Sequence, residues 1–169
     1  MFVWRICAKK YQSSAFSGIG GLYVSGRWHP QGHKIVYTAE SLALASLEIF
    51  VHLESDRIPL VAIKAWLPDE LEIEEIERGS SRRRKAQEQV SRERSQLPDN
   101  WQDTSAYPIL QKMGQDWLNS TRTPVLKVPS AIVPVEYNYL LNPQHPELKI
   151  VLEPPIRFRF DRRMWKTEV

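Results

Sequence analysis

Glycine, arginine and aromatic side chains gather in residues 17–38, SGIGGLYVSGRWHPQGHKIVYT, which hold five of the chain's seven glycines. Glycine is favoured where backbone takes a positive φ or approaches a ligand closely. Arg27 lies between Gly26 and the indole of Trp28. A guanidinium presents a planar fork of donors that matches phosphate oxygens. The segment therefore predicts a binding loop for an anionic, planar ligand such as a nucleotide, with Arg27 and Trp28 as ligand-binding residues.

Glu48 is the strongest single candidate for a catalytic group. It lies within SLALASLEIFVHL, where apolar residues surround it and no Lys or Arg stands three or four positions away. Burying an unpaired carboxylate costs several kcal/mol, so such a group has a purpose or a distant partner. A functional carboxylate is favoured over a core ion pair with a distant arginine or a Glu48 side chain that reaches water.

Three further side chains are candidates for binding. The ring of Tyr37 either stacks on a ligand or packs in the core, and the residues alone do not choose between these. Ser130, between Pro129 and Ala131, lacks a nucleophile-elbow motif, so a binding hydroxyl is favoured over a nucleophile. Asn142 precedes Pro143, which is a turn signal that favours a structural role.

Other catalytic motifs are absent from the sequence. Neither a phosphate-loop motif nor a dinucleotide fingerprint opening a helix occurs, so the common nucleotide-binding folds are not expected. His29 and His33 flank Pro30 and Gly32 and share no helical face, so no metal site is expected.

The elements that must position these residues are a mixture of short strands and helices. Strands are expected at 2–7, 34–37, 60–66 and 156–160, with two more within 123–135 broken at Pro129 and Ser130. Helices are expected at about 41–53, capped by Glu40 or Ser41, and within 101–119. Strands and helices do not alternate regularly, so the pattern predicts an α+β fold.

Length and composition favour one domain, residues 1–169, with a charged insertion at about 78–100 that is nearly devoid of apolar residues between Gly79 and Leu97. The net charge of +3 is too diffuse to identify a nucleic-acid-binding protein. The single cysteine, Cys7, is expected to be a buried, inert thiol in a reducing compartment. The sequence begins with no secretory signal and contains no membrane-length apolar run, so a cytoplasmic protein without a membrane partner is expected.

Several separated motifs together resemble the RES domain, the toxin half of bacterial toxin–antitoxin pairs, and they follow the family's order over nearly the whole chain. They are SGRWHPQG, IVYTAES, LALASLEIFVHL, GQDWLNS, VLKVPSAIVPVEYNYLLNPQHP and FRFDRR. The arginine, glutamate and serine that name the family map onto Arg27, Glu48 and Ser130. Tyr37 matches another site position, so the resemblance implies Glu48, Arg27 and Tyr37 as catalytic residues. Asn142 falls in the C-terminal signature.

The resemblance implies an ADP-ribosyltransferase-like fold, with small twisted mixed sheets and flanking helices. It also implies NAD as a substrate that is consumed, with no separate cofactor. Glu48 would stabilise the sugar cation and Arg27 would hold a phosphate. Tyr37 would pack against the nicotinamide or its ribose, Ser130 would hydrogen-bond NAD, and Trp28 and Asn142 would complete the binding site.

The implied partner is a helix-turn-helix antitoxin, with nucleic acid contacted only through it and a homodimer within the complex. Two features depart from the family pattern: the charged insertion, and His29 where asparagine is common. ADP-ribosyl transfer to a protein is the alternative activity. A nucleic-acid-binding module using arginines within 82–94 and 157–163 is the alternative from another class. Hydrolysis and phosphorolysis of NAD also remain open.

Overall fold

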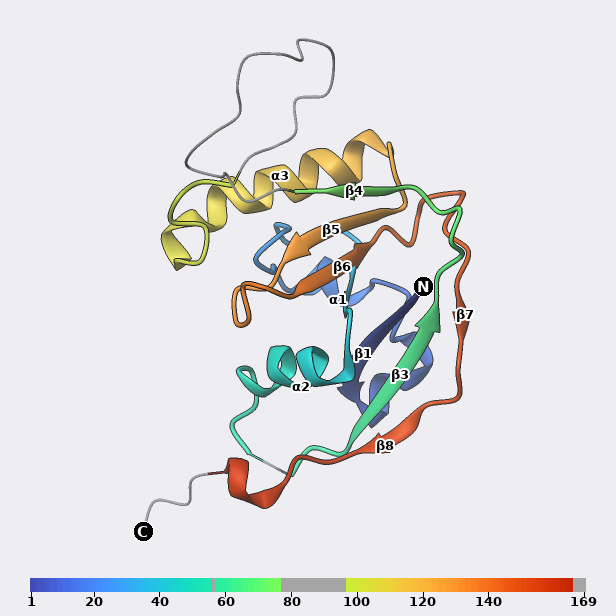
Figure 1. Cartoon of the computed structure of the whole chain (residues 1–169), viewed down its shortest axis with the longest axis vertical. Coiled ribbons are helices and arrows are strands. Elements are labelled where there is room, and N and C mark those ends of the chain that lie inside the picture. The colour runs from blue at the N-terminus through green and yellow to red at the C-terminus, as the bar shows by residue number, and fades with distance from the viewer. Residues whose placement is uncertain (56, 77–96, 166–169) are drawn as a thin grey trace.

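The computed structural model describes residues 1–55, 57–76 and 97–165, and in them eight strands form one sheet (Figure 1). The strand order is β4-β5-β6-β2-β1-β3-β7, and β8 also pairs with β3. Only β4 and β5 run parallel; the other pairs are antiparallel. The strands are β1 Phe2–Ala8, β2 Val36–Ala39, β3 Leu60–Trp66, β4 Ile73–Glu75, β5 Val125–Pro129, β6 Tyr137–Leu141, β7 Val151–Leu152 and β8 Ile156–Phe158.

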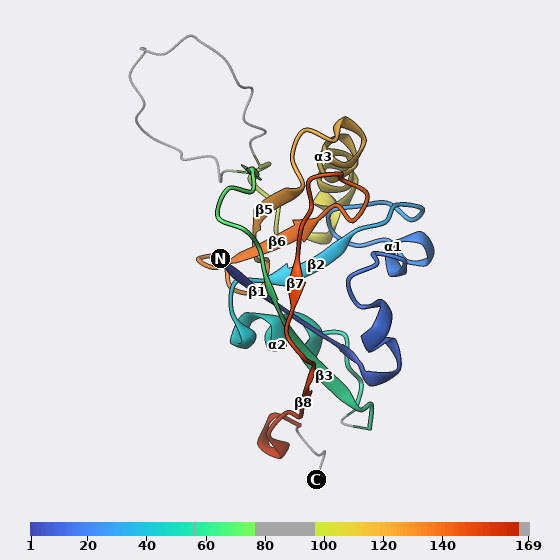
Figure 2. The ribbon, with the colours of Figure 1, turned by 90° about the vertical axis from the view of Figure 1, so that its right-hand side faces the viewer.

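The helices are α1 Gly20–Tyr23, α2 Leu42–Phe50 and α3 Tyr107–Ser120, with 3-10 turns η1 Lys9–Ser14, η2 Thr104–Ala106 and η3 Arg162–Met164. Helices α2 and α3 pack on the same face of the sheet, α2 over β1 and β3 and α3 over β5 and β6. The segment with η1 and α1 lies beside the strands, as Figure 2 shows. None of the described helices has the length and apolar composition needed to cross a membrane.

The register of the sheet decides which side chains reach that helix-covered face. Tyr37 pairs with Leu140, Ala39 with Asn138, and Val128 with Asn138, so these side chains share one face. The core beneath α3 includes Leu126, Val128 and Leu140. The core beneath α2 includes Ile6, Ala39 and Ala62. Asn138 therefore stands at the boundary between the two cores, where α2 and α3 meet the same sheet.

Gly114 allows α3 to pack against the loop that carries Arg27. A Cβ at this position would lie 1.8 Å from the carbonyl oxygen of Trp28, a distance that no real contact permits. The Trp28 indole is 2% exposed and belongs to the core beneath α3. This glycine, unfavourable in the middle of a helix, is required for the close approach.

Most predicted elements are present, and the α+β class is confirmed. Two details were wrong: the strands form one sheet rather than several small ones, and residues 131–136 form a turn instead of a second short strand. The next strand is β6, which comes later because the Ser130 side chain caps that turn. The expected strand at 34–37 lies two residues further on, as β2.

The charged insertion predicted at 78–100 falls mostly outside the described residues. Its last part, from Leu97, is described, and Leu97 is buried in the core beneath α3. The adjoining Trp101 is buried in the same core. The segment that follows the insertion therefore packs in this core, and its Trp101 carbonyl accepts a hydrogen bond from Arg27.

Candidate functional site

Glu48 projects from α2 toward the ends of β5 and β6. The helix begins after Ser41, whose side chain accepts the Leu44 N–H, as an N-cap does. Only Leu44 and Ala45 of α2 are buried and Glu48 is half-buried, so the helix is less buried than the apolar residues around Glu48 in the sequence indicate. Glu48 Oε1 accepts hydrogen bonds from the Ser130 hydroxyl, at 2.8 Å, and from Asn138 Nδ2.

The two carboxylate oxygens of Glu48 differ in their surroundings. Both donors bind Oε1, while Oε2 accepts no hydrogen bond from any described residue. Oε2 is also not among the buried polar atoms that lack a partner in the described part of the chain. One oxygen therefore fixes the carboxylate, and the other is left to face a ligand.

Ser130 is fully buried, and its hydroxyl is fully used by the protein. The oxygen accepts the N–H groups of Ile132 and Val133, at 3.1 and 3.0 Å, and its one proton goes to Glu48. This differs from the expectation that Ser130 hydrogen-bonds a ligand, because a hydroxyl has only one proton to donate. In this structure Ser130 orients Glu48.

Asn138 is the site residue that sequence reasoning missed. It is 9% exposed and lies on β6, where it pairs with Ala39 on one side and Val128 on the other. A buried amide in the middle of a strand needs a hydrogen-bond partner, and Glu48 supplies it. The available signal was an asparagine between two tyrosines ahead of two leucines, but the pattern predicted no strand at 137–141.

Tyr37 holds the loop of Arg27 against β2. Its hydroxyl accepts the Trp28 N–H at 3.2 Å and lies 2.8 Å from His29 Nδ1. His29 Nε2 lies 3.1 Å from the Val24 carbonyl, which can only accept, so Nε2 carries the ring proton and Nδ1 accepts from Tyr37. A Cβ on Gly26 would stand 2.6 Å from the Tyr37 hydroxyl, so glycine is required there.

Burial dominates the electrostatics of this pair. Desolvation raises the pKa of Tyr37, with smaller effects from the Trp28 N–H, Tyr107, Arg27 and Glu48. Desolvation also lowers the pKa of His29, against the opposing hydrogen bond to the Val24 carbonyl. Both groups are therefore neutral near pH 7, and Tyr37 acts as a hydrogen-bonding and packing residue, not as a base.

Arg27 is held by the segment that leads into α3. Its Nη1 donates to the Trp101 carbonyl at 2.8 Å, and its guanidinium lies 4.7 Å from the centre of the Tyr107 ring. Gln111 on α3 donates to the Gly26 carbonyl at 2.9 Å. The half-buried Arg27 keeps Nε and Nη2 without partners among the described residues. Trp28, by contrast, points its indole into the core, away from any ligand.

Arg27 and Glu48 lie in the same neighbourhood. The charges of both act on the Tyr37 hydroxyl, Arg27 lowering and Glu48 raising its pKa beneath the larger effect of burial. Gln102, next to the carbonyl that holds Arg27, donates to the Ala131 carbonyl beside Ser130 at 3.2 Å. In such an arrangement the oriented carboxylate can stabilise a developing cation, and the free donors of the guanidinium can hold an anionic group of the same ligand.

Asn142 is not brought to this cluster. Its N–H donates to the Pro124 carbonyl, and its Oδ1 accepts the Gln144 N–H at 3.1 Å. It follows the end of β6 that pairs with Val125, whereas Ser130 lies beyond the end that pairs Pro129 with Tyr137. In the structure Asn142 organises a turn at the far end of the strand.

Comparisons with known proteins identify the family and the fold of this chain. A family model described as RES domain matches residues 2–162. The Prs ADP-ribosylating toxin of Sphingobium sp. is 37% identical over 95% of this chain and 94% of its own, and a Toxin Res of Pseudomonas putida is 38% identical over 87% and 88%. The fold is similar to a chain in the crystal structure of the M. tuberculosis MbcT-MbcA toxin-antitoxin complex. That match has a TM-score of 0.69 and 14% identity, and it covers 94% of this chain and 84% of that one.

Proposed function

Because the chain belongs to the RES domain family, we propose that it is the toxin of a toxin–antitoxin pair and an enzyme that consumes NAD. The reaction breaks the bond between nicotinamide and ribose, so NAD is a substrate and no separate cofactor is needed. The observation that carries the proposal is the Glu48 carboxylate, with Oε1 fixed by Ser130 and Asn138 and Oε2 free, in the neighbourhood of Arg27.

Glu48 supplies the charge that this reaction needs. When the nicotinamide–ribose bond breaks, its electron pair leaves with nicotinamide, which departs neutral, and positive charge develops on the ribose. A carboxylate beside the sugar stabilises that oxocarbenium-like state, as in glycoside hydrolysis. Fixing Oε1 before the substrate arrives means that little reorganisation is required in the transition state. Oε2 then lies free to face the ribose.

Arg27 and Tyr37 place the substrate. The free Nε and Nη2 of Arg27 suit a bidentate grip on a phosphate of NAD, with the rest of the guanidinium held by Trp101 and Tyr107. Tyr37 stands on the same face of the sheet as Asn138, and its ring is available to the nicotinamide or ribose while its hydroxyl holds the loop. These contacts fix the dinucleotide, while Glu48 acts on the sugar.

The acceptor of the ribosyl group separates three outcomes. Water yields nicotinamide and ADP-ribose, inorganic phosphate yields a phosphorylated ADP-ribose, and a protein nucleophile becomes ADP-ribosylated. Transfer to a protein is the second candidate, because the Sphingobium relative is named for ADP-ribosylation. Incubation with NAD, with and without phosphate and cell protein, followed by mass spectrometry of all products, distinguishes the three.

We also propose an antitoxin as partner, since the similar fold was solved in a toxin-antitoxin complex. A helix-turn-helix antitoxin, contact with nucleic acid only through it, a homodimer within the complex and a cytoplasmic location belong to the same proposal. Co-expression with the protein encoded by the adjoining gene tests it. We expect a stable complex in which NAD consumption is blocked, and full activity in that complex would contradict the inhibitory role.

The decisive experiment is the substitution Glu48→Gln. It keeps the shape and removes the charge, so we expect NAD consumption to fall about 1000-fold, which corresponds to about 4 kcal/mol of transition-state stabilisation. Glu54→Gln, an exposed position beyond α2, is the matched control and keeps full activity. Thermal melting verifies that both variants fold. An unchanged rate in folded Glu48→Gln protein would remove Glu48 from the mechanism and with it this proposal.

A further inference from the structure

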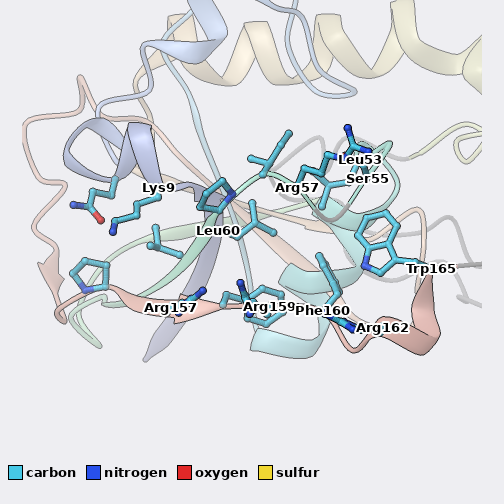
Figure 3. Close-up of a pocket in the computed structure, with 16 residues that line it drawn as sticks. Lys9, Leu53, Ser55, Arg57, Leu60, Arg157, Arg159, Phe160, Arg162 and Trp165 are labelled. Atoms are coloured by element: carbon cyan, nitrogen blue, oxygen red, sulfur yellow. The ribbon is translucent and has the colours of Figure 1, made fainter.

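A cavity of about 760 Å³ lies on the other side of α2 from the β5–β6 turn, and none of its lining residues belongs to the Glu48 site. It is enclosed by the loop between α2 and β3, by η1, and by the chain from Pro155 to Trp165 (Figure 3). Its volume falls within the range of known small-molecule sites. The NAD chemistry proposed above makes no use of it.

The lining of this cavity is strongly cationic. Five basic side chains from these three segments line it: Lys9, Arg57, Arg157, Arg159 and Arg162. No carboxylate in the described part of the chain comes within 4 Å of any of the five cationic groups. Arg163, the next residue along, does not line the cavity and is paired with Asp161 at 2.9 Å. We call this feature the basic cavity.

Like charges around one space repel one another, so this cluster destabilises the folded protein when the cavity holds no anion. The floor strengthens this effect, because Leu60 and Val61 are each 5% exposed and give the cations an apolar, poorly screening surface. Trp165 closes one end, where its ring packs on Phe160, and its Nε1 is buried without a partner among the described residues. An anionic ligand would relieve the repulsion among these cations.

We propose that the basic cavity binds a small, phosphate-rich anion, either a nucleoside triphosphate or an inorganic oligophosphate. Guanidinium groups bind phosphate oxygens in pairs, and four of the five cations are arginines. The arginines of 157–163, which composition alone linked to nucleic acid, mostly line a concave space, which fits a compact ligand better than a duplex. The proposal does not depend on the reaction at Glu48.

The test is calorimetric titration of the protein with ATP and with inorganic tripolyphosphate at about 0.1 M salt. To keep ATP out of the Glu48 site, the titrations use Arg27→Ala/Glu48→Gln protein. We expect binding of at least one ligand, and at least a tenfold loss of affinity in Arg157→Ala/Arg159→Ala. Arg163→Ala, the matched control outside the cavity, keeps the affinity. If the double variant does not fold, Arg162→Ala replaces it, with an expected loss of several-fold.

The two ligands distinguish the source of the anion. Tighter binding of ATP identifies a nucleotide, and equal or tighter binding of tripolyphosphate identifies an inorganic oligophosphate. The proposal is overturned if neither ligand binds, if the cavity variants bind as well as the control, or if a short duplex or a hexaglutamate peptide binds the cavity more tightly than both. With wild-type protein, NAD consumption in Arg157→Ala/Arg159→Ala is expected to be unchanged, so failure here leaves the proposed reaction intact.

Discussion

The Glu48 site and the basic cavity lie on opposite sides of α2 and differ in whether their charged groups have partners within the protein. Around Glu48, a single carboxylate is fixed by two neutral donors, and the nearby arginine is held by a carbonyl and an aromatic ring. Around the basic cavity, five cations converge with no carboxylate partner among the described residues. The first arrangement orients one charge, whereas the second accumulates many.

This difference separates a reacting group from a binding surface. A group that stabilises a transition state gains from being fixed in advance, because reorganisation would raise the barrier. A surface that attracts a polyanion gains from unneutralised charge, even at some cost in stability. Removing a partner near Glu48 is therefore expected to cost activity or stability, and removing a cation from the cavity is expected to raise stability.

Among the variants that test this contrast between the two regions, the largest expected effect is on catalysis, in Asn138→Leu. Leucine has the same branched arrangement of four side-chain heavy atoms as asparagine but cannot donate to Glu48 Oε1, so the carboxylate loses one of its two donors. We expect kcat for NAD consumption to fall about 100-fold, equivalent to about 2.7 kcal/mol. KM is expected to change little, because Arg27 grips the phosphate independently.

Steady-state kinetics and thermal melting, measured on the same preparations, separate positioning from general damage to the fold. Arg159→Ala, across α2, serves as the comparison and is expected to keep both constants. If Asn138→Leu raises KM and leaves kcat unchanged, Asn138 does not act through Glu48. If both variants lose kcat equally, the two regions are not independent and the comparison fails.

The next effect is on stability, in Ser130→Ala. Alanine removes the acceptor of two part-buried N–H groups and one of the donors to Glu48. We expect the free energy of unfolding to fall by about 2 kcal/mol, since these donors lose their partner and Glu48 loses a hydrogen bond. Urea denaturation measures it. Ser46→Ala on α2, where the hydroxyl donates only to the Ala43 carbonyl, is expected to change stability by less than about 0.5 kcal/mol.

Individual strands and helix α2 could be predicted from local sequence pattern, but the contacts within the site could not. The strands β1 and β3 are mostly apolar, each with one basic residue, and Ser41 is a strong cap for α2, so each element can be recognised within a few residues. Strand β6 begins with Tyr-Asn-Tyr and is followed by Asn-Pro, and this pattern predicted a turn but no strand. Its pairing with both β2 and β5 overrides that local preference.

The site depends on this long-range register. Asn138 and Glu48 are 90 residues apart, and Ser130 and Glu48 are 82 apart, so their hydrogen bonds exist only once β6 lies between β2 and β5. Local reasoning found Glu48 because a lone carboxylate in an apolar helix is conspicuous. The same local pattern predicted ligand contacts for Trp28 and Ser130. It could not reveal that α3 packs on Trp28 or that Ser130 caps the turn at residues 131–136.

A smaller effect concerns pH and the neutral pair that supports the Arg27 loop. Burial lowers the pKa of His29, so the folded state binds its proton less readily than the unfolded chain does. Stability is therefore fully present above about pH 6.5, the ordinary value, and is lost as pH falls through the lower pKa of the folded state. Protonation also turns Nδ1 into a donor facing the Tyr37 hydroxyl.

One proton contributes at most about 1.4 kcal/mol per pH unit, so this effect is gradual. Urea denaturation from pH 7.5 downward measures it against His29→Asn, whose amide oxygen can accept from Tyr37 but does not titrate. We expect the difference in stability between the two proteins to change in favour of His29→Asn below about pH 6.5. Parallel curves would show that His29 is not the titrating group.

The smallest expected effect has the opposite sign, in Arg159→Gln. Glutamine keeps much of the side-chain stem and removes one of five mutually repelling charges at the basic cavity. Because these cations are exposed, the gain in free energy of unfolding is only about 0.3 kcal/mol at low salt. It is expected to vanish near 1 M salt, where the screening length is about 3 Å. Thermal melting at both salt concentrations measures it, with Arg163→Gln, which loses its Asp161 partner, as the comparison. A loss of stability in Arg159→Gln at low salt would mean that the cation is already neutralised within the protein, and the contrast between the two sides of α2 would not hold.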